Sequence, residues 1–260
     1  MHLVLNKRLV RERLLAFVSK PNASVRFVFG NQKSGTSAIA GLIAAAAGLP
    51  LITDFAGAQE PFIGELIRGE IPVAAYVKRN AWAFSAPIVK EPSLTFVAPA
   101  LMDHFASRRA VMVVRDPWHN IRSILERVDV RGDLDKIVPG KRRINRTWVS
   151  ILAGSDLGLP PQHYIDVLAK RWLRATEIAD ILKNRLTIVR YEDFSRDKRG
   201  TVEHLAGDLS FPVTEDISAI VDRQFQPRGR GADPKAFFGE NYARITAICG
   251  AKAKEYGYTP

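Results

Sequence analysis

Short runs of apolar residues alternate along the chain with longer segments in which apolar residues recur every three or four positions. The short runs predict buried strands, which we place at 25–29, 86–89, 110–114 and 186–189. The longer segments predict helices at 7–19, 36–47, 118–128, 164–182 and 238–256. Continuous apolar strands that alternate with helices are typical of a parallel sheet covered on both faces. We therefore predict an α/β fold with three layers, in which a central, mainly parallel sheet carries helices on both faces.

The domain organisation follows from the length and from two segments outside this alternation. A chain of 260 residues is short enough for one α/β domain, so we expect a single domain over 1–260 with a leading helix in 1–24. Residues 129–163 are rich in charge, glycine and proline, and they predict an insertion that consists of a long loop and a short helix. No stretch is apolar enough for a membrane helix, and the first 20 residues make a poor secretory signal. The expected compartment is therefore the cytoplasm.

The net charge of the chain indicates which classes of partner it can bind. Lysine and arginine outnumber the acidic residues and give a net charge of +11, with a sequence pI near 9.9. Such a surplus favours an anionic partner, which can be a nucleic acid, a membrane surface or a phosphate- or sulfate-bearing small molecule. The single cysteine, Cys249, excludes an intramolecular disulfide framework and a cysteine-rich zinc module.

A glycine-containing loop joins the first predicted strand to the next helix. The segment 30–37 reads Gly-Asn-Gln-Lys-Ser-Gly-Thr-Ser. Backbone N–H groups at such a turn point toward an anion, and the helix dipole favours its negative charge. Compared with the ATP-binding P-loop, both glycines and Ser37 match, but Thr36 stands in the place of the lysine and Lys33 lies three residues earlier. The loop therefore predicts a phosphate-binding strand-loop-helix unit with an altered position of the cation.

A second anion anchor follows the strand at 110–114. Arg115 leaves the end of the strand, and Ser123 lies eight residues further, about two turns into the next helix. A guanidinium and a hydroxyl group that converge on one point suit a phosphate. Asp116 allows another interpretation, because an aspartate after an apolar strand is also typical of the magnesium site of P-loop kinases and NTPases.

These segments resemble the sulfotransferases that use 3′-phosphoadenosine 5′-phosphosulfate (PAPS). The run Lys33-Ser34-Gly35-Thr36-Ser37 is similar to the family's 5′-phosphosulfate loop, although Gln32 stands where the family has proline. The pair Arg115 and Ser123 resembles the 3′-phosphate motif in order and spacing. Tyr191 lies in a Tyr-Glu-Asp segment whose tyrosine the family places near the adenine, and Arg228 lies in a basic stretch similar to an element that covers the 3′-phosphate. The resemblance implies PAPS as donor, no metal, and cofactor binding by Lys33, Ser34, Gly35, Thr36, Ser37, Arg115, Ser123, Tyr191 and Arg228.

The resemblance also implies catalytic residues. Lys33 is expected to stabilise the leaving phosphate, and Lys90 resembles a second lysine that faces the sulfuryl group. The histidine that cytosolic members place two residues later is replaced by Pro92. The base is therefore expected to be a carboxylate. Glu60 and Glu91 rank about equal, with Glu60 slightly favoured because neighbouring strand residues point to opposite faces; Asp54 and then His104 follow.

Three function classes stay open at this point. The leading expectation is a sulfotransferase that moves a sulfuryl group from PAPS to a hydroxyl or amine acceptor by in-line transfer. The acceptor is expected to be a small molecule or a carbohydrate- or lipid-linked group, and the insertion at 129–163 is expected to lie on its side. A P-loop kinase or NTPase is the alternative. A nucleic-acid-binding protein is third, motivated only by the basic stretch 107–146, and we expect no nucleic acid as partner.

Overall fold

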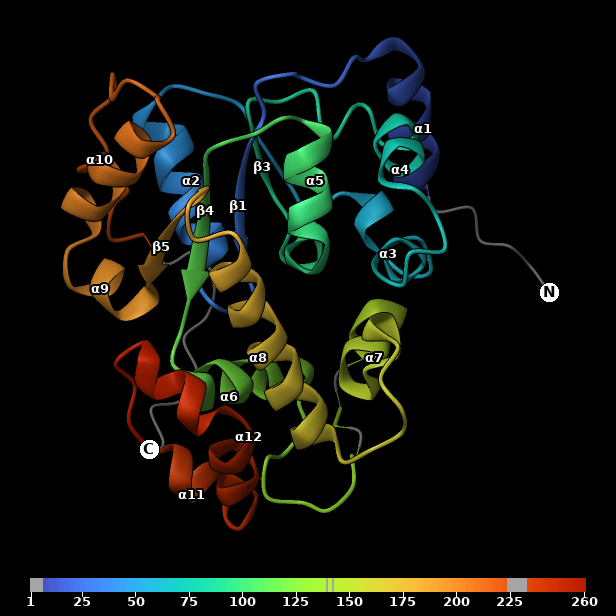
Figure 1. Cartoon of the computed structure of the whole chain (residues 1–260), viewed down its shortest axis with the longest axis vertical. Helices are drawn as coiled ribbons and strands as arrows, with labels where there is room; N and C mark the ends of the chain where they lie inside the picture. Colours follow the sequence, from blue (N-terminus) through green and yellow to red (C-terminus); the bar gives the residue numbers. More distant parts are fainter. Residues whose placement is uncertain (1–6, 139, 142, 224–232) are drawn as a thin grey trace.

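A parallel β-sheet runs through the middle of the computed structural model, which describes residues 7–138, 140–141, 143–223 and 233–260 (Figure 1). Within these residues the sheet has five strands in the order β2-β3-β1-β4-β5, and every neighbouring pair is parallel. The strands are β1 (Arg26–Gly30), β2 (Leu51–Thr53), β3 (Ile88–Lys90), β4 (Ala110–Val114) and β5 (Leu186–Arg190). Because all strands point the same way, the segments that follow them emerge at one edge of the sheet.

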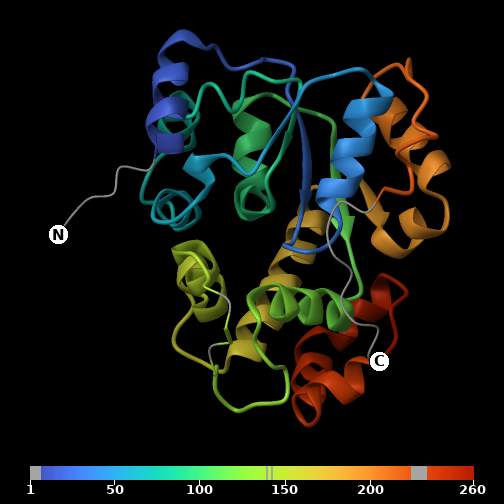
Figure 2. The ribbon, with the colours of Figure 1, turned by 180° about the vertical axis from the view of Figure 1, so that it is seen from behind.

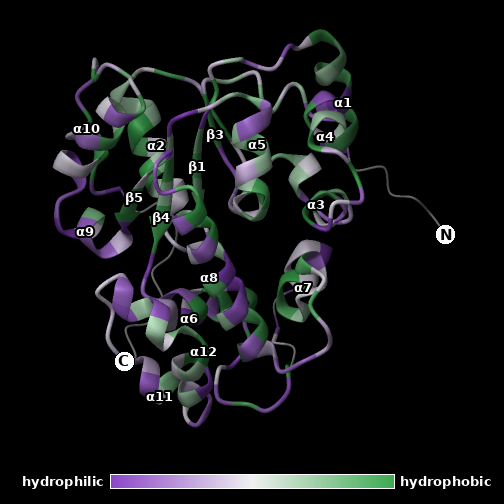
Figure 3. Cartoon of the chain, viewed as in Figure 1, coloured by the Kyte–Doolittle hydropathy of each residue, from purple (hydrophilic) through white to green (hydrophobic). Residues whose placement is uncertain are grey.

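The side chains of the central strands alternate between two apolar cores, one on each face of the sheet. In β1, Phe27 and Phe29 belong to one core and Val28 to the other; in β4, Met112 and Val111 divide in the same way. The hydropathy colouring shows these strands as largely hydrophobic (Figure 3). Helices on both faces close the cores, which confirms the predicted three-layer α/β architecture (Figures 1 and 2).

The helices divide between the two faces. The core that contains Val28 is covered by α2 (Thr36–Ala46) and α10 (Lys198–Asp208). The larger core that contains Phe27 is covered mainly by α5 (Ala98–His104), α6 (Pro117–Val128), α8 (Tyr164–Ile181) and α12 (Asn241–Glu255).

Shorter helices complete the described part of the chain. They are α1 (Lys7–Val18), α3 (Phe62–Ile67), α4 (Val73–Arg79), α7 (Arg146–Ala153), α9 (Tyr191–Arg196) and α11 (Pro234–Phe238), with 3₁₀ turns η1 (Ala56–Ala58), η2 (Pro92–Val97) and η3 (Ser155–Leu157). None of the helices in the described ranges is long and apolar enough to cross a membrane.

The four predicted strands and five predicted helices all exist, and the structure also contains elements that the sequence patterns do not predict. Strand β2 was missed because it is only three half-buried residues long and directly follows Pro50. Helices α3, α4, α5, α9 and α10 are not predicted either. The terminal helix expected over 238–256 is α12, which begins only at Asn241, because Gly239, with φ 53°, ends the short preceding helix α11.

Candidate active site

A cavity of about 680 Å³ lies at the carboxyl edge of the sheet. Its lining includes a residue from the segment that follows each described strand: Lys33 after β1, Asp54 after β2, Glu91 after β3, Arg115 after β4 and Tyr191 after β5. This is the edge at which open parallel sheets bind ligands.

The cavity brings together most of the residues that the sequence singles out. Those that line it are Lys33, Gly35, Thr36, Ser37, Lys90, Glu91, Arg115, Ser123 and Tyr191. Ser34 is buried and donates a hydrogen bond to the Asn31 carbonyl within the loop, at 2.7 Å. Glu60 and His104 are not among the lining residues, and Arg228 lies outside the described residues.

Hydrogen bonds to neighbouring segments fix the phosphate loop, and no side chain caps the helix that follows it. The Gly30 N–H donates to Thr95 Oγ1 (2.9 Å), and Asn120 Nδ2 donates to the Gln32 carbonyl (2.8 Å). Helix α2 then begins after Gly35, which has φ 99° and offers no side chain to cap the first turn. Thr36 and Ser37 of this turn line the cavity, so the helix start is available to an anion.

Gly35 cannot be replaced without moving Tyr191. A Cβ atom on Gly35 would lie 2.2 Å from Tyr191 Cδ2, and the positive φ is itself strained for any residue with a side chain. The loop and the aromatic ring are therefore packed in direct contact, although they lie far apart in the sequence.

Gln32 connects the phosphate loop to a buried charge network. Its Nε2 donates to Ser93 Oγ (3.0 Å), and its Oε1 accepts from Arg171 Nε (2.9 Å). Arg171 is fully buried, forms an ion pair with buried Asp156 and lies over the Phe96 ring, 4.2 Å from its centroid. The sequence does not predict this network, because nothing in the local pattern marks a buried arginine in the middle of α8.

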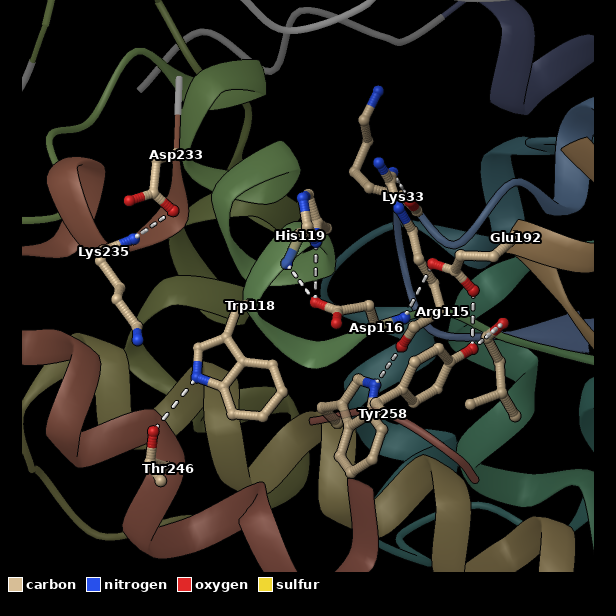
Figure 4. Close-up of polar contacts among 12 residues, drawn as sticks. Lys33, Arg115, Asp116, Trp118, His119, Glu192, Asp233, Lys235, Thr246 and Tyr258 are labelled. Carbon is tan, nitrogen blue, oxygen red and sulfur yellow. Dashed lines mark hydrogen bonds and ion pairs between the residues drawn. The ribbon is translucent and has the colours of Figure 1, made fainter. Parts of the chain in front are cut away.

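Lys33 lies close to two other positive charges, Arg115 and Arg127. Its backbone adopts φ 66°, and its carbonyl accepts a hydrogen bond from Arg115 Nη1 at 2.8 Å (Figure 4). Burial, followed by repulsion from Arg127 and Arg115, lowers the pKa of Lys33 to about 8. An anionic ligand in the cavity would oppose this effect and favour the charged lysine.

Arg115 is fixed at the end of β4 by contacts on both sides. Its carbonyl accepts from Trp172 Nε1 (2.8 Å), and its guanidinium lies 4.7 Å from the centroid of the Tyr191 ring. Burial lowers the pKa of Arg115, and its Nε atom is buried without a hydrogen-bond partner in the protein. A buried guanidinium donor without an acceptor indicates a place for a ligand. Ser123 lines the same cavity from α6.

The segment after β5 both lines the cavity and holds neighbouring segments in place. Tyr191 lines the cavity, whereas Glu192 binds the scaffold: it accepts from the Asp116 N–H (3.2 Å) and from the Tyr258 hydroxyl (2.7 Å) (Figure 4). Glu192 thereby ties the end of β5 to the end of β4 and to the C-terminal segment.

Two carboxylates line the cavity near Lys90. The ammonium group of Lys90 is buried and lies 3.0 Å from Asp54 Oδ1, whereas the Asp54 side chain is largely exposed. Glu91 caps the turn η2 by accepting from the Ser93 N–H (3.1 Å), and burial raises the pKa of Glu91 to about 7. Lys90 and Glu91 both line the cavity, so alternation along the strand does not separate them.

Glu60 is not among the residues that line the cavity. Its backbone N–H donates to Thr147 Oγ1 (3.0 Å), and its side chain packs against Gly64. Burial raises the pKa of Glu60. The expected position of Glu60 inside the pocket therefore has no support from the lining residues, although its neighbour Gln59 does line the cavity.

The cavity is also lined by residues that the sequence patterns do not single out. Asn145, Thr147, Trp148 and Ile151 come from α7 and its N-terminal cap, within the predicted insertion. Arg122 and Arg127 come from α6, and the Arg127 guanidinium lies 6.0 Å from the centroid of the Trp148 ring. The spacing of Arg127 four residues after Ser123, on one helix face, is the signal that could have identified it.

Comparison with known proteins identifies the fold. No protein-family model and no curated protein sequence matches the chain. Among solved structures, mouse sulfotransferase SULT7A1 complexed with PAP superposes with a TM-score of 0.53 at 13% identity, over 97% of this chain and 95% of that one. A sulfotransferase from Alicyclobacillus acidocaldarius matches 89% of this chain and 96% of its own, with a TM-score of 0.45 and 14% identity. The chain therefore has the sulfotransferase fold, as the resemblance of its phosphate loop predicts.

Proposed function

We propose that the chain is a sulfotransferase that moves a sulfuryl group from PAPS to a hydroxyl or amine acceptor by in-line transfer. The observation that carries the proposal is that Lys33, Arg115, Ser123 and Tyr191 line a single cavity, although they come from three different strand ends. Each belongs to a motif that resembles a nucleotide-binding motif of this family, and the fold is the same.

The residues present fit a nucleotide with phosphate groups at two places. We name residues 30–37, Arg115, Ser123 and Tyr191 the donor wall. The uncapped start of α2 suits the 5′-phosphosulfate, because unpaired helix N–H groups and the helix dipole attract an anion. Arg115, with its buried and unpaired Nε, suits the 3′-phosphate together with Ser123. Tyr191 offers a ring against which the adenine can stack.

The proposed chemistry assigns one task to each charged residue. In the transfer, the bond from sulfur to the bridging oxygen of the 5′-phosphate breaks while a bond from sulfur to the acceptor forms. Lys33 stabilises the negative charge that develops on the bridging oxygen, and Lys90 faces the sulfuryl oxygens. A carboxylate receives the proton of the acceptor.

Glu91 is the carboxylate that best suits this role. It lines the cavity, and its pKa of about 7 lies close to neutral pH, where a general base works best. Asp54 also lines the cavity but is paired with Lys90. Glu60 does not line it, so we rank Glu60 last among these three.

The opposite side suits the acceptor. We name residues 54–59 and 145–151 the acceptor wall. It combines apolar groups, such as Phe55, Trp148 and Ile151, with polar side chains, such as Asn145 and Thr147. This mixture suits a small-molecule or a carbohydrate- or lipid-linked hydroxyl compound.

The two alternative functions receive no support from the site. The carboxylate of Asp116, which a kinase would use for magnesium, accepts from the His119 N–H (2.8 Å) and contacts its ring (Figure 4), and Asp116 does not line the cavity. Arg115, Arg122 and Arg127, from the basic stretch 107–146, line the cavity, which leaves fewer charges for an extended nucleic-acid surface.

Titration calorimetry with 3′-phosphoadenosine 5′-phosphate (PAP), AMP, ATP and single-stranded DNA tests the proposal. We expect PAP to bind at least tenfold more tightly than AMP, because a charge-assisted hydrogen bond contributes about 1.5 to 3 kcal/mol. Arg115→Met should remove this preference and leave AMP binding nearly unchanged. Equal affinity for PAP and AMP in the natural protein would refute the assignment of the donor. Radiolabelled PAPS with a panel of phenols, sterols and sugars then identifies the acceptor.

A further inference from the structure

Helix α1 exposes an apolar face. Val10, Leu14, Phe17 and Val18 are 39%, 64%, 87% and 82% exposed, respectively. Their spacing, with intervals of four, three and one residues, places all four on one side of the helix. Single exposed apolar residues are ordinary, but four on one face of one helix mark an interaction surface.

The opposite side of α1 holds the helix to the protein through polar groups. Arg8 Nη2 donates to the Asp54 carbonyl (2.5 Å), and Glu12 Oε2 accepts from the Ala56 N–H (2.6 Å). The Arg13 guanidinium lies over the Phe62 ring, 5.0 Å from its centroid. No residue of α1 is buried. The helix is thus attached by the side that carries Arg8 and Glu12, and its exposed apolar side is not part of the core.

Positive charge borders the apolar face. Lys7 and Arg11 are exposed, and their spacing to Leu14 and Val18 places them along the same side of α1. The neighbouring helix α4, which lies beside α1 in Figure 1, adds exposed Lys78 and Arg79. The chain as a whole has a net charge of +11. An apolar strip with basic residues at its border is complementary to the surface of an anionic bilayer, which offers acyl chains and phosphate headgroups together.

We propose that α1 docks the protein on an anionic membrane surface. The four apolar side chains enter the boundary between headgroups and acyl chains, while Lys7 and Arg11 contact lipid phosphates. The helix has 12 residues, so it lies along the surface and does not span the bilayer. This surface is separate from the donor wall and goes beyond the proposed enzymatic function.

Cosedimentation of the full chain with vesicles tests the proposal. One set contains phosphatidylcholine alone, and the other contains phosphatidylcholine mixed with phosphatidylserine. We expect preferential binding to the anionic vesicles. The double variant Phe17→Ser/Val18→Ser should weaken that binding about tenfold or more, because it removes most of the inserted apolar surface. The pair Lys7→Gln/Arg11→Gln should weaken it by roughly fivefold for each lost charge, and only on anionic vesicles.

A matched control uses an exposed apolar residue elsewhere. Ile181, at the end of α8, is 67% exposed, so Ile181→Ser should bind vesicles as the natural protein does. PAP affinity measured in parallel should be unchanged in every variant, which also shows that each one folds. A failure of PAP binding in the natural protein would affect only the proposed function.

Three results would overturn the membrane proposal. The first is that the natural protein does not sediment with anionic vesicles. The second is that the serine pair binds these vesicles as strongly as the natural protein. The third is that ultracentrifugation reveals a dimer that dissociates in the serine pair while vesicles have no effect. The last result would assign the apolar face of α1 to a second copy of the chain.

Discussion

The donor wall and the acceptor wall face the same cavity, but the chain builds them differently. Each donor residue follows a strand of the sheet directly or lies on the helix that comes next, so a short stretch of backbone fixes its position. The acceptor wall joins segments far apart in the sequence. The hydrogen bond from the N–H of Glu60, which directly follows the first segment, to Thr147 of the second, for example, joins residues 87 positions apart. Local sequence motifs therefore predict the donor wall, whereas the acceptor wall forms only through tertiary packing.

The two walls are connected through Arg171. This buried arginine donates to Gln32 of the phosphate loop and forms an ion pair with Asp156, which lies in η3 directly after α7. If both walls depend on this link, removing it should destabilise the protein more than a change within one wall.

The largest effect is therefore expected from Arg171→Met. Removing one partner of a buried ion pair leaves an uncompensated charge, and we expect the free energy of unfolding to fall by about 3 to 5 kcal/mol in urea denaturation. The control is Arg199→Met, whose partner Asp216 is exposed, with an expected loss below about 1 kcal/mol. Equal losses in the two variants would mean that Arg171 does not hold the walls together.

The next effect concerns the chemistry at the donor wall. Lys33→Ala should lower the turnover number about 100- to 1000-fold, the range found when one donor to a developing oxyanion is removed. PAP affinity should change much less, because the charge of the lysine matters most when the bridging oxygen becomes anionic. The measurement is steady-state kinetics with an acceptor from the panel, together with PAP calorimetry. A normal turnover number would leave Lys33 with a structural role only.

The same contrast explains what the sequence could predict. Four of the five described strands, the three layers and the meeting of Lys33 with Arg115 followed from apolar runs and from polar residues at strand ends. Strand β2 could not be predicted, because three half-buried residues show no hydrophobic periodicity. Its pairing with β3 is what makes this segment a strand. The positions of Trp148 and Arg171 at the site could not be predicted for a different reason. Their roles depend on partners in other elements, which no local sequence pattern encodes.

The proposed general base, Glu91, lines the cavity but belongs to neither wall, and the pH dependence of the reaction tests its role. If Glu91 is the base, proton transfer needs its ionised form; burial raises the pKa of Glu91 to about 7, so kcat/KM should fall as the pH drops below about 7. The charged form of Lys33 is also needed, and its pKa of about 8 predicts a second fall above that pH.

Substitution of the two glutamates separates them. Glu91→Gln should lower turnover about 100-fold and abolish the acidic limb of the pH profile, while its amide oxygen can still accept from the Ser93 N–H. Glu60→Gln is the matched comparison, and it should retain both the rate and the limb. The reverse outcome would restore the preference for Glu60 that the sequence suggests.

The smallest effect is expected at the acceptor wall. Trp148→Ala removes an aromatic side chain that lines the cavity opposite the nucleotide, and we expect the KM for the acceptor to rise several-fold to about tenfold. PAP affinity should stay the same, because Trp148 belongs to α7 and not to the donor wall. Trp148→Phe should recover most of the loss if the ring contacts the acceptor, and it should recover little if the role of Trp148 is to position Arg127, since the cation–π attraction is weaker for phenylalanine. A weaker PAP affinity in Trp148→Ala would show that the two walls are not separate, because a residue from the insertion would then contribute to donor binding.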